Sequence, residues 1–288
     1  MTDPGDAQRA AGGWHVLEPG EDSDQVEHLA AELLNTGCDY RLIAASRRGR
    51  SHEHTGTYRE DAFAVGASAN GAWMIAVADG AGSCRLSRVG ARIATQVARD
   101  SVLRALQEMT DAIPSEPRTA VLEAAHDARL AVTDEAHRRA CSPVDLSCTL
   151  LILLYLPTGQ SGRVAAFQVG DGLVAVIDAE GKMTSLTGVD SAAWAGETRF
   201  LTSDLGDTWD HRAQLVAFPE PPHGFIVASD GVADDLVPFD KNLPILWRAV
   251  DEVVADPTPD RALLELLNYQ KRGSFDDRTL VVARRSQR

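Results

Sequence analysis

Four short acidic segments are the part of the sequence best suited to chemistry. Each places an acidic residue at the end or the start of an apolar run, beside glycine or another small residue. Burying an uncompensated carboxylate at such a position costs on the order of several kcal/mol unless a cation or hydrogen-bond donors offset it. The segments are Arg59–Phe63, Ala78–Gly82, Ala228–Val232 and Gly273–Thr279.

Two of these apolar runs stop at an Asp-Gly pair, Asp79-Gly80 and Asp230-Gly231. Carboxylates suit hard cations such as Mg²⁺ and Mn²⁺, which prefer oxygen ligands and keep several waters. Glycine after the aspartate allows a tight turn and lets its backbone carbonyl approach an ion. One Asp-Gly pair is most often an ordinary turn, but four acidic segments in one chain together indicate a divalent-cation site.

The order of the motifs resembles the type 2C metal-dependent serine/threonine protein phosphatases, in their bacterial branch. The similarity runs from about residue 44 to residue 283. It depends on Glu60-Asp61, Asp79-Gly80, Ser229-Asp230-Gly231 and Asp276-Asp277-x-Thr279. The resemblance implies hydrolysis of phosphoserine and phosphothreonine in proteins by a water that two Mn²⁺ or Mg²⁺ ions activate. It also implies a phosphorylated protein substrate and a cognate serine/threonine kinase as a partner to test.

The resemblance assigns a role to each matching position. Asp79 resembles the carboxylate that bridges the two ions, and the Gly80 carbonyl resembles a ligand of the second ion. Asp230 and Asp276 resemble ligands of the first ion. The expected catalytic residues are Asp79, Asp61 and Glu60, and the expected metal ligands are Asp61, Asp79, Gly80, Asp230 and Asp276. Asp277 stands where the family often has Asn, so we expect it to be a neighbour of the site.

The sequence departs from the family where the substrate phosphate is held. Members usually carry an arginine four residues before the Glu-Asp pair, and here that position is Gly56. Eukaryotic members carry a histidine after the bridging Asp-Gly, and here Ala81 fills that place. The candidate substitutes that could hold the phosphate are His52, His54 and Arg50.

Two further aspartates have weaker expectations. Asp145 precedes Ser147-Cys148-Thr149 and is a candidate ligand for a possible third ion. Asp171 lies in Gly170-Asp171-Gly172, where we expect its side chain to cap the turn.

Two other functions remain open. His52-Glu53-His54 is a histidine pair of the kind found in zinc hydrolases, but the other histidines supply no companion motif. The stronger alternative is a catalytically weak phosphatase-like binding module that regulates a partner kinase or signalling protein. Turnover of a generic aryl phosphate with added Mn²⁺ separates it from an enzyme.

Composition excludes several classes of partner. The formal net charge of −14 disfavours binding to nucleic acid or to an anionic membrane surface. No apolar stretch approaches the roughly 20 residues that span a bilayer, and no signal peptide is visible, so we expect a cytoplasmic protein. The four cysteines form no CxxC pair and fit reduced thiols.

The hydrophobic pattern predicts an α+β fold, a four-layer α-β-β-α sandwich of two mainly antiparallel sheets flanked by helices. Strand-like runs joined by tight turns, such as Asn70-Gly71, alternate with two long helical segments near 87–109 and 116–139. We expect residues 1–37 to be an acidic N-terminal extension with a short helix over 25–34, and residues 38–288 to be the phosphatase domain. Residues 184–213 are expected to form a surface insertion or flap.

Overall fold

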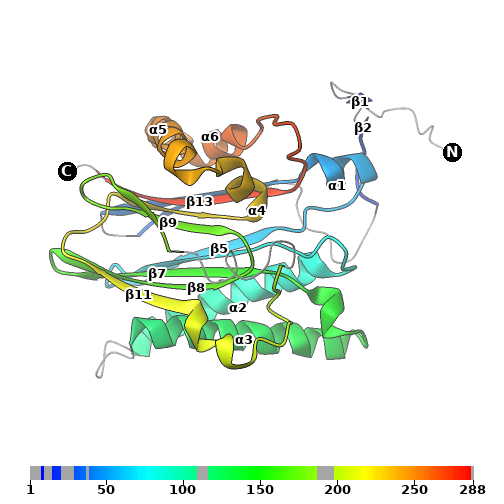
Figure 1. Ribbon diagram of the computed structural model, residues 1–288, viewed down its shortest axis with the longest axis horizontal. Coiled ribbons are helices and arrows are strands. Elements are labelled where there is room, and N and C mark those ends of the chain that lie inside the picture. Colours follow the sequence, from blue (N-terminus) through cyan, green and yellow to red (C-terminus); the bar gives the residue numbers. More distant parts are fainter. Residues whose placement is uncertain are drawn as a thin grey trace.

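Two antiparallel sheets packed face to face, with helices on both outer sides, form the four layers of the molecule (Figure 1). The computed structural model describes residues 8–9, 15–20, 29–36, 39–108, 116–186 and 198–286. The predicted α+β sandwich is therefore confirmed. Its layers, in order, are a helical layer, a six-stranded sheet, a five-stranded sheet and a second helical layer.

The five-stranded sheet has the order β11-β8-β7-β6-β5, and every pair in it is antiparallel. Its strands are β5 (Ala62–Ala67), β6 (Trp73–Ala78), β7 (Leu150–Thr158), β8 (Ser161–Val169) and β11 (Ala213–Phe218). The predicted Asn70-Gly71 turn joins β5 to β6, and Gly71 adopts a positive φ of 83° there, which favours glycine.

The six-stranded sheet has the order β10-β9-β12-β13-β4-β3. Its strands are β3 (Leu29–Asn35), β4 (Tyr40–Arg47), β9 (Leu173–Ile177), β10 (Met183–Ser185), β12 (Gly224–Ala228) and β13 (Arg278–Arg285). A separate pair, β1 (Gln8–Arg9) and β2 (His15–Val16), lies beside the end of the sandwich.

The helix expected over residues 25–34 is wrong in its described part. Leu29–Asn35 forms the edge strand β3, which pairs antiparallel with β4. Backbone hydrogen bonding to a neighbouring strand here outweighs the local helical pattern. The domain boundary after residue 37 stays a prediction. Strand β3 lies before that boundary and yet belongs to the six-stranded sheet of the main domain.

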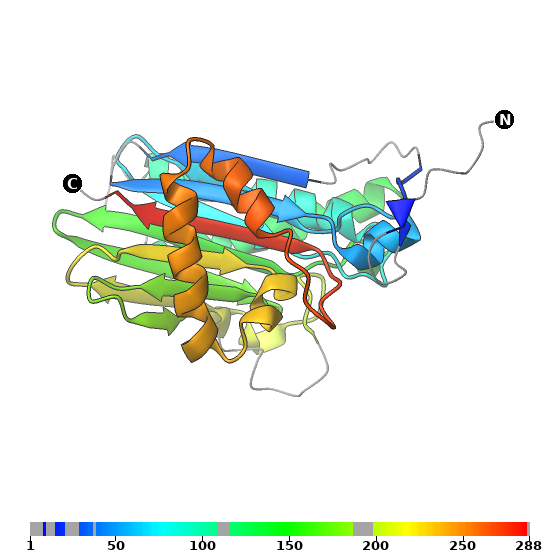
Figure 2. The same cartoon turned by 90° about the horizontal axis from the view of Figure 1, so that it is seen from above.

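Helices cover the outer face of each sheet (Figures 1 and 2). The long helices α2 (Ser87–Glu108) and α3 (Pro117–Arg138) cover the five-stranded sheet, and α5 (Phe239–Ala255) and α6 (Pro259–Leu266) cover the other. The short helices are α1 (Arg50–Thr55), α4 (Asp230–Ala233), η1 (Pro143–Leu146), η2 (Gly206–Thr208), η3 (Asp210–Arg212) and η4 (Asp234–Leu236). Within the described ranges, no helix has the length and apolarity to cross a bilayer.

Aromatic side chains fill the space between the two sheets. The rings of Tyr40, Trp73, Tyr155 and Phe225 lie with centroids between 4.9 and 5.9 Å apart. All four are almost fully buried. Because helices also cover the outer faces, the central strands are apolar on both sides, which explains their nearly continuous hydrophobic runs.

The segment expected to be a surface flap is partly built into the core. Leu201 and Leu205 are 0% and 3% exposed and pack with the cluster under α2 and α3. The flap prediction is therefore wrong for these two leucines. Two apolar positions four residues apart are too short a pattern to indicate that both are buried. Residues 187–197 of the predicted flap lie outside the described residues.

Candidate metal centre

The strand register brings the acidic segments to one end of the sandwich. In the five-stranded sheet, Ala62 pairs with Ala78, so Asp61 and Asp79 lie at the same end of β5 and β6. Antiparallel neighbours always place the start of one strand beside the end of the next. The two motifs are therefore adjacent although the β5–β6 hairpin separates them in sequence.

The six-stranded sheet contributes the other two motifs in the same way. Ala228 at the end of β12 pairs with Leu280 near the start of β13. Asp230, the first residue of α4, therefore follows one strand where Asp276 precedes the other. The two sheets supply two acidic segments each.

Asp61 joins the two sheets through its side chain. Its Oδ2 accepts hydrogen bonds from Ser229 Oγ at 2.7 Å and from Thr279 Oγ1 at 2.6 Å, both on the six-stranded sheet. Its Oδ1 is buried and has no hydrogen-bond partner among the described residues. Burial, followed by the charge of Asp277, raises the pKa of Asp61 to about 6, although the neighbouring Asp79 carboxyl and the two hydroxyl donors act to lower it.

Asp79 and Gly80 lie deep in the same place. The Asp79 N–H donates to Thr149 Oγ1 at 2.8 Å, which fixes the turn after β6. Burial raises the pKa of the Asp79 carboxyl well above its usual range, and the charges of Asp61 and Asp230 raise it further. Gly80 has no room for a side chain, because a Cβ would lie 2.9 Å from Ser87 Cβ.

Glu60 and Asp230 complete the buried acidic group. Glu60 Oε2 is buried and has no hydrogen-bond partner among the described residues. Burial raises the pKa of Glu60 to about 7, against the opposing charge of His52. Burial also raises the pKa of Asp230 to about 8, with the charges of Asp61 and Asp276 acting in the same direction. These mutual effects show that the carboxylates repel one another.

Asp277 is a buried carboxylate that accepts hydrogen bonds from several parts of the site. Its carboxylate is 1% exposed and accepts from Gly49 N at 2.6 Å, His52 Nδ1 at 2.9 Å, Glu60 N at 2.5 Å and Asp61 N at 3.4 Å. Both oxygens are thus occupied by donors from the chain. We interpret Asp277 as the residue that positions Glu60 and Asp61, which agrees with its predicted place as a neighbour of the site.

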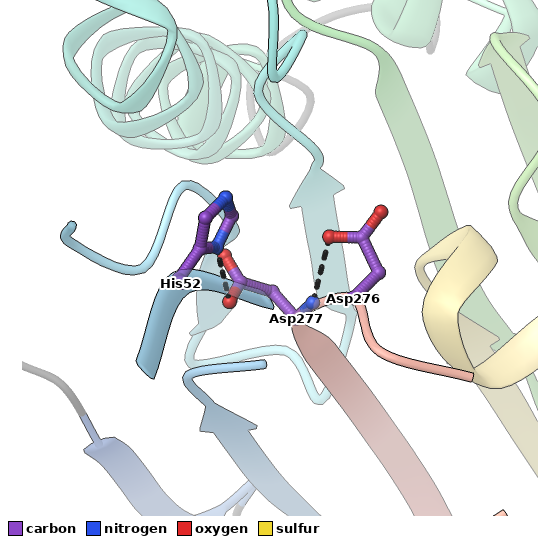
Figure 3. A group of neighbouring side chains, drawn as sticks. All are labelled: His52, Asp276 and Asp277. Carbon is purple, nitrogen blue, oxygen red and sulfur yellow. Dashed lines mark hydrogen bonds and ion pairs between the residues drawn. The ribbon is translucent and has the colours of Figure 1, made fainter. Parts of the chain in front are cut away.

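His52 faces Asp277 from α1. Figure 3 shows Nδ1 directed at the Asp277 carboxylate and the second ring nitrogen directed away from it. Burial alone would lower the pKa of His52, but the hydrogen bond and charge of Asp277 raise it to about 9. Ligand atoms of His52, Asp276 and Asp277 lie within 4.8 Å of one another. Because Asp277 is saturated by N–H donors, we interpret this trio as an ion pair beside the metal centre and not as a zinc site.

A pocket of about 360 Å³ opens beside Asp230 and Asp276, which both line it. Asp234 and Asp235 also line this pocket, and the sequence reasoning missed both. Asp235 accepts hydrogen bonds from Tyr269 Oη at 2.6 Å and Ser274 Oγ at 2.7 Å, so it anchors the loop before β13. The signal for this pair was present in the sequence, four and five residues after Asp230.

The remaining predicted residues lie in different surroundings. Arg50 is partly buried at the start of α1, whereas His54 is exposed near its end. Asp145 uses its Oδ2 to accept from the Ser142 N–H at 3.0 Å and so closes the cap of η1. Its candidacy for a third ion stays a prediction.

The structure gives Asp171 a hydrogen-bond partner outside its own turn. It is exposed, and its Oδ2 accepts from Thr198 Oγ1 at 2.8 Å. Its charge contributes to raising the pKa values of Asp230 and Asp276, which places it near the acidic group. The expected turn cap stays a prediction, and the donor observed for Asp171 comes from a segment distant in sequence.

The donor set fits divalent cations of the Mn²⁺ or Mg²⁺ type. Asp61 Oδ1 and Glu60 Oε2 are buried oxygens with no donor among the described residues. Buried polar atoms in native proteins almost always have partners, so each such atom requires an explanation. A cation supplies it and also offsets the repulsion among the carboxylates.

Comparison with known proteins agrees with this fold. The family model for protein phosphatase 2C matches residues 48–268. The structure is similar to the catalytic domain of the serine/threonine phosphatase PstP in complex with two manganese ions, at 20% identity and a TM-score of 0.52, with 86% of this chain and 99% of that chain covered. Similarity extends to RsbX in complex with magnesium, at 12% identity and a TM-score of 0.53, with 89% and 100% covered.

PppA of Pseudomonas aeruginosa is similar at 20% identity and a TM-score of 0.52, with 86% of this chain and 98% of that chain covered. No curated protein matches the chain. The expected cofactor type agrees with the ions bound in PstP and RsbX.

Proposed function

We propose, from the premise that this chain belongs to the protein phosphatase 2C family, that it is a serine/threonine protein phosphatase of the dinuclear-metal type. It removes phosphate from phosphoserine and phosphothreonine in proteins. The single observation that carries this proposal is the Asp61 carboxylate. Two hydroxyl donors bind its Oδ2 while its Oδ1 is left buried without a donor among the described residues.

The residues that would hold the ions are those that the resemblance assigned. They are Asp61, Asp79, the Gly80 carbonyl, Asp230 and Asp276, with Glu60 positioning the waters around them. When bound, two such ions supply a water of lowered pKa and neutralise charge on the phosphoryl oxygens. No side chain of the chain needs to form a covalent intermediate.

The chain itself orients the ligands. Ser229 and Thr279 fix the rotation of the Asp61 carboxylate and so direct Oδ1 toward the site. Asp277 holds the backbone of Glu60 and keeps His52 protonated across the neutral pH range. The His52 nitrogen that faces away from Asp277 is then a cationic N–H donor for the substrate phosphate.

The Asp79→Asn variant tests the proposal. Wild-type protein should hydrolyse an aryl phosphate and a phosphothreonine peptide with added Mn²⁺ and lose activity in excess EDTA. Asp79→Asn should lower kcat/KM by roughly a thousandfold or more, because a neutral amide would replace the charged carboxylate that would hold the ions. Full activity in EDTA would refute the mechanism.

The alternative of a regulatory binding module makes the opposite prediction. In that case the wild-type protein binds Mn²⁺ in calorimetry yet turns over neither substrate. The same measurements therefore decide between the two functions.

A further inference from the structure

A second pocket beside the metal centre is rich in arginine. It has a volume of about 80 Å³ and shares Asp276 with the larger metal-centre pocket. Its polar and basic lining residues are Arg47, Arg48, Arg50, Asn268, Gln270 and Arg278. Glu53 and Asp276 are the carboxylates on its wall. In a chain with a net charge of −14, four arginines around one small pocket form a local region of opposite sign.

Two of these arginines face each other across the sheet. Arg47 on β4 pairs directly with Arg278 on β13, so their side chains leave the same face of the sheet. Like charges directly opposite each other destabilise a sheet unless something neutralises them. Arg278 has Asp235 at 3.9 Å. Arg47 makes no ion pair or hydrogen bond with another side chain in the described parts of the chain.

Two of the pocket's arginines are buried and held by the surrounding chain. Arg48 and Arg278 are 5% and 6% exposed, and the Nε of each has no hydrogen-bond partner among the described residues. Arg48 donates to Thr57 O and Leu17 O, and Arg278 donates to Tyr269 O and to Ser274 Oγ, so both guanidinium groups are fixed in place. Arg278 has Asp235 only at 3.9 Å, and Arg47 has no carboxylate partner among the described residues. The pocket wall therefore combines a rigidly held arginine, Arg278, with an uncompensated one, Arg47.

A carboxylate or phosphate group matches this wall. Guanidinium groups bind both through paired N–H donors. The pocket has the volume of about two or three waters, which is room for one such group and not for a nucleotide. Because its wall includes Asp276, an anion seated there lies next to the phosphate that the metal centre would cleave.

We propose that this arginine pocket binds a second anionic side chain of the phosphoprotein substrate, an aspartate, a glutamate or another phosphorylated residue close to the scissile phosphate. This inference rests on the proposed phosphatase function and adds the substrate class that the site prefers. Cations at the metal centre would offset the charge of Asp276 and leave the arginines to attract the anion.

The test compares matched phosphothreonine peptides. An acidic residue is moved through the four positions on each side of the phosphothreonine, and each peptide has a partner with the corresponding amide. A third set carries phosphoserine in place of the acid. For wild-type protein with Mn²⁺, at least one position should show an acid-to-amide ratio of kcat/KM of roughly 10, the size expected for one charge-assisted contact.

Arg47→Gln should bring that ratio close to 1, and Arg47→Lys should restore part of it, because the charge returns without the planar fork. Arg41→Gln is the matched control: it removes an arginine from the other end of the same strand and should keep the wild-type ratio. The ratio is independent of overall changes in turnover, since both peptides meet the same enzyme.

A binding measurement separates failure of the pocket from failure of the catalytic function. Hydrolysis-resistant phosphonate versions of the best acid and amide peptides should differ in Kd by a similar factor in fluorescence anisotropy, and Arg47→Gln should remove the difference. Equal ratios for acid and amide at every position overturn the pocket, as does a preference that survives Arg47→Gln. A protein that turns over no phosphopeptide but shows the Arg47-dependent difference in Kd retains the pocket and loses the phosphatase.

Discussion

The two neighbouring aspartates before β13 have opposite surroundings. Asp277 is buried and accepts four hydrogen bonds from N–H donors, whereas Asp276 is exposed and faces the large pocket. Adjacent carboxylates in one loop thus divide two tasks. Asp277 holds the backbone that carries Glu60 and Asp61, and Asp276 faces the pocket, where we propose that it holds a cation.

Substituting each aspartate by asparagine should separate the two tasks. Asp277→Asn places an NH₂ group against N–H donors and should lower the free energy of unfolding by about 2 kcal/mol, the cost of losing a charged acceptor in a buried site. Asp276→Asn should leave the free energy of unfolding near the wild-type value and weaken Mn²⁺ affinity. Urea denaturation in EDTA and calorimetric titration with Mn²⁺ measure the two effects. The reverse pattern would show that Asp277 is the ligand.

At the scale of elements, glycine lets short helices approach the strand end that carries the site. A Cβ on Gly231 in α4 would lie 2.0 Å from the Asp277 carbonyl oxygen, and one on Gly49 would lie 2.2 Å from the Asp276 carbonyl carbon. Both contacts are to backbone, which cannot rotate away. The position of Asp230 at the start of α4 therefore depends on the absence of a side chain at the next residue.

Gly231→Ala tests this dependence. Alanine is a better helix former by about 1 kcal/mol, but the backbone clash should prevail and lower the free energy of unfolding by roughly 1–3 kcal/mol. The displaced α4 should also weaken Mn²⁺ binding. Gly66→Ala in β5 is the control, because the nearest atoms to its Cβ are side-chain atoms of Leu103 and Arg99, at 3.0 to 3.3 Å, which can shift, so the substitution should cost less. A Gly231→Ala protein with wild-type stability and Mn²⁺ affinity would contradict the close packing described here.

Much of the fold was predictable from local sequence patterns. The features that the sequence did not predict depend on contacts between residues distant in sequence. The β5–β6 hairpin and both long outer helices follow from turn residues and periodicity that neighbours in sequence determine. The strand at 29–35 was predicted to be a helix, because its strand state depends on pairing with β4. The contact between Asp171 and Thr198 was not predictable for the same reason, since the two residues are distant in sequence.

For the site, the acidic positions were predictable and their supports were not. The sequence indicated the carboxylates because each ends or starts an apolar run. It did not indicate that Ser229 and Thr279 bind Asp61, although both lie within the predicted motifs. Nor did it indicate that both carboxylate oxygens of Asp277 accept hydrogen bonds. The four N–H donors come from another part of the chain, and only folding brings them next to Asp277.

For the whole molecule, the buried carboxylates connect stability to pH and to metal. The pKa values of Asp61, Glu60 and Asp230 are raised to about 6, 7 and 8, whereas carboxyls in an unfolded chain titrate near about 4. Between these limits the folded protein binds more protons than the unfolded one. The free energy of unfolding therefore falls as the pH rises through this window, in the absence of metal.

Divalent cations should reverse this trend. In EDTA, the thermal midpoint should fall between about pH 5 and pH 8, since each deprotonation leaves a buried negative charge among others. Cations bind the deprotonated carboxylates, so the rise in midpoint that saturating Mn²⁺ produces should be larger at pH 8 than at pH 5. Differential scanning calorimetry at matched ionic strength measures both slopes.

Asp230→Asn should flatten the slope in EDTA and reduce the Mn²⁺ effect, because it removes one of the titrating groups. Asp127→Asn is the control, since its carboxylate accepts from Ser101 and Arg104 on the outer helices, and it should change neither. A thermal midpoint in EDTA that rises steadily from pH 5 to pH 8 would show that these carboxylates do not repel one another in the folded protein.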